Sequence, residues 1–347
     1  MPLIEVPFQM IAMDLIELRT LAQAGNNLTE FKSTLRKVLK LRVPGTLEHT
    51  QVKQAIVNHF EDLGGWDVSL DKFDEETVLG KKSFSNIIVT LNPSVDRRLV
   101  LACHYDTKFY ASSPEGKQFL GATDSAVSCA ILMELAKRLD KYLKAPNIQK
   151  EVTLQMVFFD GEEAFLEWTA TDSLYGSRHL AALWQNTTYP PGSDTTMLSG
   201  IDDLVLLDLL GARHPSIYNF FSDTSDIYNQ LMDIEKRLSA EELTARVSPY
   251  FVGSAHSPIF VEDDHVPFLE KVTNLILVVC QPAFVNNPRT RTRRNSDTVL
   301  TVASTDFLTM LFIIFSQFLY WSGWQNHGRT NLWVSRPITL DISVTED

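Results

Sequence analysis

Short apolar runs recur along the chain and alternate with stretches whose apolar positions follow helical spacing. The runs of strand length cover residues 85–91, 98–103, 152–159, 204–209 and 274–279. Between the second and third runs, residues 125–139 carry Ala126, Ala130 and Met133 at helical spacing and predict a crossover helix. This order predicts an α/β fold: a single globular domain with a mainly parallel central sheet flanked by helices.

The most apolar segment, residues 307–321, is too short to span a bilayer, which takes roughly 20 residues. It also contains Ser316 and Gln317, and we expect it to form a buried helix rather than a membrane span. At 347 residues with 44% hydrophobic content, the chain can bury a large core.

The charge of the chain restricts its partners. Its 43 acidic residues exceed its 31 basic residues, which gives a formal net charge of −12. Nucleic-acid binding requires a basic face that neutralises phosphates, so we expect no nucleic acid and no membrane among the partners. Small molecules and peptides are the partners that this composition favours.

Acidic side chains follow three of the predicted strands. Asp106 comes after the second run, residues 160–163 (Asp-Gly-Glu-Glu) come after the third, and Asp208 lies near the end of the fourth. Parallel strands bring their carboxyl ends to one edge of a sheet, where the sites of open α/β folds are found. Clustered carboxylates are costly unless a cation neutralises them, so the pattern indicates a metal site with hydrolytic or acyl-transfer chemistry.

Each of these acids also has a structural explanation. A single Asp after a strand commonly caps a helix or stabilises a turn. Glu162 and Glu163 could mark the exposed start of a helix, where acids favour the positive end of the helix dipole. The metal-site hypothesis therefore depends on several acids occurring together.

Six segments of the chain closely resemble animal glutaminyl cyclases, and they occur in the same order. They cover residues 84–88, 101–106, 121–126, 158–165, 172–180 and 263–269. The resemblance extends over residues 31–324 and leaves 1–30 as an N-terminal extension or helix and 325–347 as a C-terminal tail. It implies a monomeric α/β-hydrolase-like domain related to zinc aminopeptidases and phosphorylase/hydrolase-like proteins. The implied reaction converts an N-terminal Gln or Glu of a peptide into pyroglutamate.

The resemblance also assigns roles to single residues. Asp124 and Glu163 match two ligands of the family's one zinc ion, and Glu162 matches its general acid/base. Asp208 and Asp263 match the two acids of its proton network. Trp168 matches an aromatic wall of its substrate pocket.

Two cysteines match a disulfide of the secreted family members, namely Cys103 and Cys129, and Cys280 would stay unpaired. The alternative is a pair of buried free thiols. The resemblance implies the secretory pathway or the extracellular space. Residues 1–7 lack the basic region of a cleavable signal peptide, which leaves a cytoplasmic location open.

The chain departs from the family where the third zinc ligand, a histidine, is expected. Residues 275–288 contain no histidine and no tryptophan, and residues 289–294 then carry four arginines. Losing a zinc ligand weakens metal binding, so the ion would be held weakly or lost. Three residues could stand in for the missing ligand, namely Asp297, His256 and His265.

Three functional hypotheses follow. The first, favoured by the family resemblance, is a zinc-dependent acyltransferase of the glutaminyl cyclase type. The second is a catalytically impaired protein that keeps the pocket with Trp168 and binds peptide N-termini without turnover. The third is an aminopeptidase-like metallohydrolase that binds its metal through His104, Asp124 and Asp208, because related peptidases use a histidine at the His104 position.

Overall fold

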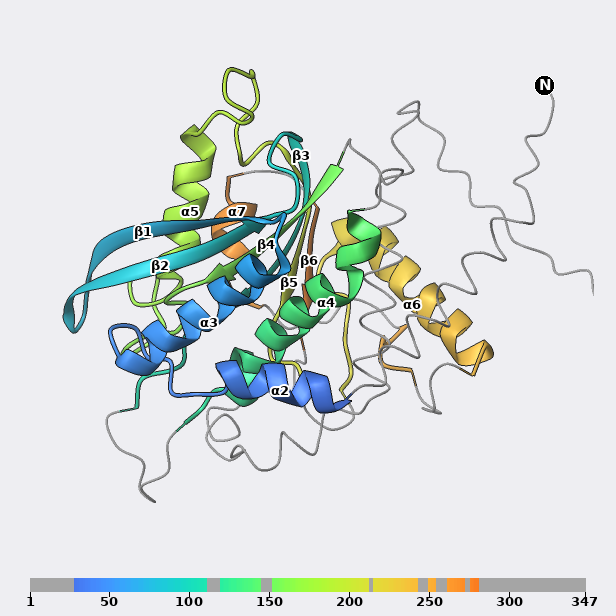
Figure 1. The fold of residues 1–347 in the computed structure, drawn as a ribbon, viewed down its shortest axis with the longest axis horizontal. Coiled ribbons are helices and arrows are strands. Elements are labelled where there is room, and N and C mark those ends of the chain that lie inside the picture. Colours follow the sequence, from blue (N-terminus) through green and yellow to red (C-terminus); the bar gives the residue numbers. More distant parts are fainter. Residues whose placement is uncertain are drawn as a thin grey trace, which may run out of the picture.

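A six-stranded sheet forms the centre of the molecule in the computed structural model (Figure 1). The structure describes residues 28–110, 119–144, 152–211, 215–242, 249–253, 261–271 and 275–280. The strands are β1 (Asp67–Thr77), β2 (Gly80–Thr90), β3 (Arg97–His104), β4 (Val152–Phe159), β5 (Ile201–Leu207) and β6 (Leu275–Val279). The expected helix at 307–321 lies outside the described residues, as do residues 281–294 of the segment that lacks the zinc histidine.

The strand order is β1-β2-β4-β3-β5-β6. Strands β4, β3, β5 and β6 pair in parallel, whereas β2 pairs antiparallel with both β1 and β4. The prediction of a mainly parallel sheet in an α/β fold is thus confirmed. Strand β4 lies between β2 and β3, although β2 and β3 follow each other in the sequence.

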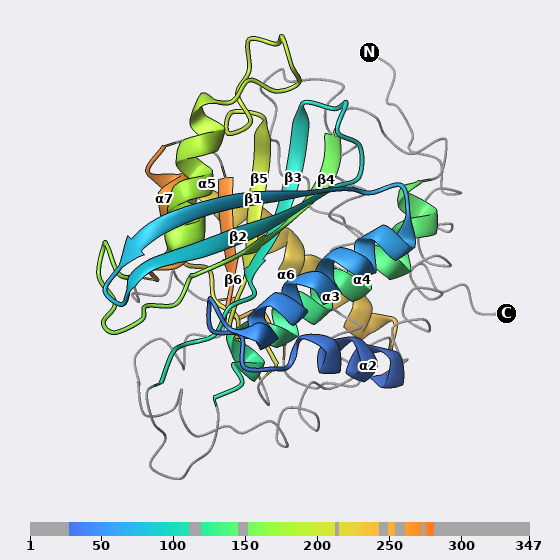
Figure 2. The ribbon, with the colours of Figure 1, turned by 60° about the vertical axis from the view of Figure 1, so that its left-hand side comes forward.

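Helices cover both faces of the sheet (Figure 2). On one face lie α2 (Leu28–Val38), α3 (Leu47–Leu63), α4 (Val127–Leu143) and α6 (Ser225–Ala240), and on the other α5 (Tyr175–Asn186) and the short α7 (Val266–Leu269). Two single turns, η1 (Ala122–Ala126) and η2 (Ser222–Thr224), precede α4 and α6. Within the described ranges, no helix is long and apolar enough to cross a membrane.

The parallel strands are apolar on both faces because both faces are covered. Along β3, Leu99, Leu101 and Cys103 pack with α3 and α4, while Val100 and Ala102 pack with α5. Strands buried in this way read as continuous apolar runs, which is why the sequence predicts them well. The edge strand β1 is only partly buried, and its polar sequence predicted no strand.

Arg42 ties together three segments near the carboxyl ends of the strands. Its side chain is fully buried, and all of its nitrogens donate hydrogen bonds to backbone carbonyls. Nε donates to Tyr105 O at 2.6 Å, Nη1 to Leu120 O at 2.7 Å and Nη2 to Gly121 O at 3.0 Å. An unsatisfied buried polar group costs about 1–3 kcal/mol, so these bonds make the burial of a guanidinium tolerable. They also fix the loops on which the metal-site candidates lie.

Candidate metal centre

The parallel strands bring the predicted acids to one edge of the sheet. His104 is the last residue of β3, Glu162 and Glu163 follow β4, and Asp208 follows β5. Asp124 lies in η1, directly before α4, and its peptide bond to Ser125 is cis. These side chains are all buried.

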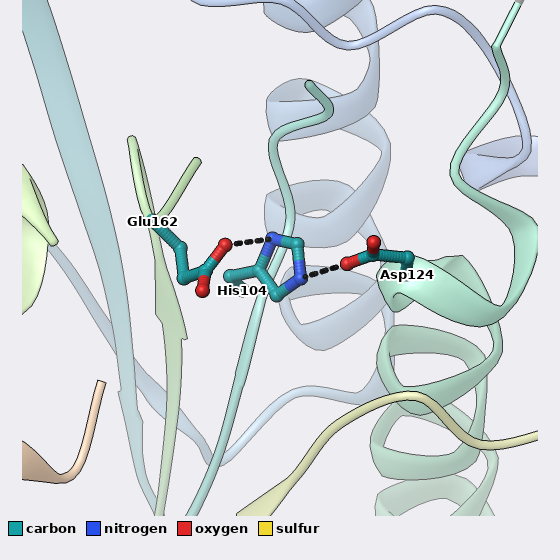
Figure 3. Close-up of side chains that lie close together, drawn as sticks. All are labelled: His104, Asp124 and Glu162. Carbon is teal, nitrogen blue, oxygen red and sulfur yellow. Dashed lines mark hydrogen bonds and ion pairs between the residues drawn. The ribbon is translucent and has the colours of Figure 1, made fainter. Parts of the chain in front are cut away.

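His104 lies between the carboxylates of Glu162 and Asp124 (Figure 3). Its Nε2 is 3.1 Å from Asp124 Oδ1 and 3.4 Å from Asp208 Oδ1. Its Nδ1 is 3.2 Å from Asp106 Oδ1 and 4.0 Å from Glu162 Oε2. Four carboxylates therefore surround one imidazole ring. The structure brings Asp106, Glu162 and Asp208 together as the strand ends predict, and η1 adds Asp124.

The backbone around Glu162 is held by Asp106. The Asp106 carboxylate accepts hydrogen bonds from the backbone N–H groups of Glu162 at 3.1 Å and of Glu163 at 3.2 Å. Gly161, just before them, has φ +67°, and a Cβ there would lie 2.5 Å from Phe84 Cε1. A glycine is needed at this position, because any larger residue would push the two glutamates away from the strand end.

Asp160 belongs to the same motif but points away from the His104 cluster. Its Oδ1 is 2.8 Å from His49 Nε2, and its Oδ2 accepts hydrogen bonds from Ser85 N at 2.7 Å and from the Tyr105 hydroxyl at 2.9 Å. The sequence pattern counted Asp160 among the clustered acids. The structure instead makes it an anchor between β4, β2 and α3.

Burial and mutual repulsion raise the pKa of several carboxyl groups near His104. Burial is the main reason why the pKa of Glu162 is well above its usual value. The charge of His104 opposes this rise, and the charges of Glu163 and Asp263 add to it. Burial, followed by repulsion from Asp208, likewise raises the pKa of Asp263, and burial raises that of Asp264 to about 7. Carboxyl groups with raised pKa values hold protons more readily, unless a nearby cation favours the ionised form.

The imidazole supplies one compensating charge. Burial lowers the pKa of His104. The charge of Glu162 and the hydrogen bonds to Asp106 and Asp124 raise this pKa by more than burial lowers it, so the net shift is well upward. Asp208 Oδ1 is buried and contacts the same ring, with His104 Nε2 at 3.4 Å, so that one imidazole is shared among four carboxylates. A protonated His104 is therefore not enough to balance the cluster.

The available donors fit a divalent metal ion. The ligand atoms of His104, Asp124 and Glu162 all lie within 4.8 Å of one another. Imidazole nitrogen and carboxylate oxygen are normal zinc ligands. Glu163 was predicted as a ligand from the resemblance, but this group contains Glu162 in its place. The Glu163 carboxylate is buried, with its Oε2 3.9 Å from Lys108 Nζ.

One of the stand-in ligands can be placed. His265 is buried, packs edge-on against Phe221 with ring centroids 5.3 Å apart, and does not join the His104 group. Burial lowers its pKa to about 4, which keeps it neutral. The other two, His256 and Asp297, lie outside the described residues.

Trp168 lies in the loop that follows the two glutamates. The loop is held by Asp172, whose carboxylate accepts hydrogen bonds from the backbone N–H groups of Phe165 at 2.8 Å and of Leu166 at 2.9 Å. The Trp168 indole is half-buried and donates to Glu262 Oε2 at 2.9 Å. Trp168 is thereby joined to the segment that carries Asp263. Asp172 was missed as an organising residue, although its backbone partners lie only five to seven positions earlier.

The two cysteines expected to pair are neighbours with free thiols. Cys103 Sγ and Cys129 Sγ are 3.3 Å apart, and Cys129 also donates to the backbone carbonyl of His104 at 3.2 Å. Cys280 is a third buried free thiol. In the structure, Cys103 and Cys129 are therefore free thiols rather than a disulfide, and their sulfur atoms are in contact.

Comparison with known proteins finds one family and several close relatives. Residues 86–301 match the model of peptidase family M28. The chain is 40% identical over 298 residues to a glutaminyl-peptide cyclotransferase of Drosophila melanogaster, which covers 82% of this chain and 79% of the relative. The enzyme of that name from Bos taurus is 41% identical over 280 residues, with 78% and 77% covered. The crystal structure of Macrostomum lignano glutaminyl cyclase superimposes with a TM-score of 0.76 at 32% identity and covers 87% of this chain and 92% of that chain.

The shifted pKa values predict how the metal-free protein responds to pH. The folded-state pKa of Asp264, about 7, exceeds the unfolded value of about 3.9, so the folded state binds more protons across this interval. The free energy of unfolding should therefore fall as the pH rises from about 4 to about 7, by on the order of 2–4 kcal/mol. The upward shift of His104 acts in the same direction at higher pH.

Differential scanning calorimetry with a chelator at pH 5 and pH 8 measures this effect. The melting temperature should be lower at pH 8, and added zinc should remove most of the difference, because a cation compensates the ionised carboxylates. Asp264→Asn should weaken the pH dependence. A melting temperature of the chelated protein that rises with pH would contradict the expectation.

Proposed function

The chain belongs to peptidase family M28 and, within it, to the glutaminyl-peptide cyclotransferases, and from this membership we propose that it converts the N-terminal Gln of peptides into pyroglutamate. The observation that supports this proposal most strongly is the buried Glu162 carboxyl group with its raised pKa, next to the His104 cluster. A buried carboxyl group whose pKa is raised above its usual value is a stronger base than an exposed one, and it can accept a proton and return it.

The proposed reaction requires one proton acceptor that later becomes a donor. The α-amine of the substrate attacks its own γ-carbonyl carbon, the new C–N bond closes the five-membered lactam, and the bond to the side-chain amide nitrogen breaks. Glu162 takes a proton from the attacking amine and returns it to the leaving nitrogen, which departs as ammonia. The backbone N–H bonds to Asp106 keep Glu162 at the strand end during both steps.

Asp208 and Asp263 are proposed to form the proton network around Glu162. Both are buried, and Asp208 is among the groups that raise the pKa of Asp263. Neighbouring carboxyl groups in a low-dielectric site share protons rather than ionise together. Such a pair can hold the proton that Glu162 exchanges with the substrate.

We propose one zinc ion, held by Asp124 and Glu163 as the family resemblance implies, with binding weakened by the missing histidine. When bound, it would polarise the γ-carbonyl of the substrate. The excess of buried carboxylates supports a cation at this place. Trp168 would form a wall for the N-terminal residue of the peptide, because its indole is anchored beside the segment that carries Asp263.

A second candidate function is aminopeptidase-like hydrolysis, and one specific observation favours it. His104 Nε2 contacts Asp124 at 3.1 Å and Asp208 at 3.4 Å, and these three residues are the metal-binding set of that hypothesis. A metal ion held there would leave Glu162 free to activate water. Release of free amino acids from peptides that lack an N-terminal Gln distinguishes this activity from cyclisation.

A disulfide in the secreted protein is a further part of the proposal. We propose that Cys103 and Cys129 form a disulfide in an oxidising compartment, because their sulfur atoms are already in contact. Mass mapping of the secreted protein under non-reducing conditions should find the two peptides linked and Cys280 free. Two free thiols in secreted material would contradict this proposal.

Replacing Glu162 tests the proposed acid/base role. Glu162→Gln keeps the size of the side chain but cannot exchange the proton, so ammonia release from a glutaminyl peptide should fall by about 10²–10⁴-fold. Glu167→Gln is the matched control, because its side chain is exposed in the same loop and should leave turnover unchanged. Ammonia release and peptide mass should be measured together.

Two results would contradict the proposal. A Glu162→Gln variant that keeps full activity would exclude the acid/base role. A wild-type protein that binds zinc and glutaminyl peptides but releases no ammonia would be the impaired binding protein instead.

Restoring the missing histidine tests the weakened zinc site. An ungapped alignment places Pro288 where the family has its zinc histidine, and this position lies outside the described residues. Pro288→His should raise the zinc affinity by about tenfold or more. Elemental analysis after dialysis should then find a higher zinc occupancy than in the wild-type protein. Pro288→Ala is the control for loss of the proline. One zinc per chain and robust activity in the wild-type protein would show instead that the histidine is dispensable.

A further inference from the structure

A cavity lies between helix α3 and the β1–β2 hairpin, two elements that run side by side in Figures 1 and 2. Its volume is about 560 Å³, within the range of small-molecule sites. It is lined by Gly45, His49, Thr50, Lys53, Lys72, Phe73, Asp74, Ser83, Phe84 and Ser85. None of the lining residues belongs to the His104 cluster.

Asp160 separates this cavity from the metal centre. On the cavity side, its carboxylate binds His49 Nε2 at 2.8 Å and Ser85 N at 2.7 Å. On the other side, the chain continues directly through Gly161 to Glu162. The lining of the cavity therefore adjoins the Asp160 side chain and contains neither Glu162 nor Trp168.

Ser85 supplies a buried polar atom that nothing in the described structure satisfies. The residue is 3% exposed, and its Oγ has no hydrogen-bond partner within the described ranges. Ile87 and Val89, which share the strand face of Ser85 because side chains alternate, pack in the core with α3. The Ser85 hydroxyl thus faces the α3 side, where the cavity lies. A buried hydroxyl without a partner requires an explanation, and a bound ligand provides one.

Two lysines give the cavity a positive charge. Lys53 on α3 is half-buried and Lys72 on β1 is paired in register with Ser85, and neither has an acidic partner among the described residues. The one acid in the lining, Asp74, is already bound to Lys81 at 3.2 Å and to the Ser83 hydroxyl at 2.6 Å. Lys53 and Lys72 are therefore the uncompensated charges of this lining.

The first turns of α3 add to this potential. The helix has 17 residues and begins after Thr46, and Gly45, His49 and Thr50 from this end line the cavity. A helix N-terminus carries a partial positive charge and attracts anions. The ammonium groups, the hydroxyls and the helix end all favour the same class of ligand.

We propose that this cavity is a binding site for a small phosphate-bearing molecule, with Lys53 and Lys72 neutralising the phosphate and the Ser85 hydroxyl donating to it. Lysine binds phosphate as a point charge, and hydroxyl groups complete the contact. The volume of the cavity leaves room for an organic group beyond the phosphate.

Isothermal titration calorimetry with inorganic phosphate and pyrophosphate tests the site, at constant ionic strength set with chloride. The titrations use the full chain and its Asp124→Asn variant, so that anion binding to a metal at His104 is excluded. Lys53→Met and Lys72→Met keep the side-chain length and remove the charge, and each should weaken binding by about tenfold. Ser85→Ala should weaken it by about fivefold without lowering the melting temperature, because the hydroxyl has no protein partner to lose.

Lys82→Met is the matched control, because Lys82 lies on the same hairpin but outside the cavity lining, and it should leave the affinity unchanged. Equal affinity in the wild type, Lys53→Met and Lys72→Met would overturn the proposal. So would the absence of binding up to about 10 mM, a concentration at which even weak sites fill. Binding of acetate and citrate as tight as that of pyrophosphate would show a general carboxylate site and overturn the phosphate assignment. The outcome is independent of cyclase activity, because no step of the test uses turnover.

Discussion

The concentration of buried negative charge around His104 is the constraint on which the rest of the structure depends. Carboxylates in a low-dielectric interior repel one another, and each must be compensated by a proton, a hydrogen-bond donor or a cation. Asp106 is compensated by two backbone N–H groups, and Asp160 by His49, Tyr105 and the backbone of Ser85. The acids that remain, Glu162 and Asp208 among them, are available for a metal ion and for proton transfer.

The scaffold keeps this charge in place from both sides. The carboxyl ends of three parallel strands fix where the side chains begin, and Arg42 fixes the loops that follow β3 and precede α4. The guanidinium binds backbone carbonyls and so positions the loops, and its buried charge also interacts with the carboxylates of Asp106 and Asp124.

The sequence predicted the parts of the fold that depend on local pattern. Strands β2 to β6 were found because burial on both faces gives continuous apolar runs, and the acids after them mark the carboxyl edge. Strand β1 was missed because its partly exposed edge position permits a polar sequence. Arg42 was missed because nothing near it in sequence reveals partners that lie about 60 to 80 positions away. The different orientations of Asp160 and Asp106 depend on the position of β2 next to β4, which no local pattern contains.

The position of His104 links the choice of metal ligands to the choice of reaction. Its ring touches Asp124 and Asp208 through one nitrogen and lies near Asp106 and Glu162 on the other. A glutamate that binds a metal gives up its freedom to carry a proton, so Glu162 can act as acid and base only if other residues hold the ion. If Asp124 and Glu163 hold it, His104 remains a charged partner that stabilises ionised Glu162, and cyclisation is the chemistry that results. If His104 binds the metal itself, that stabilisation is lost and Asp208 becomes a ligand instead of a proton carrier. The same set of side chains is therefore compatible with two chemistries, and the choice of metal ligands decides between them.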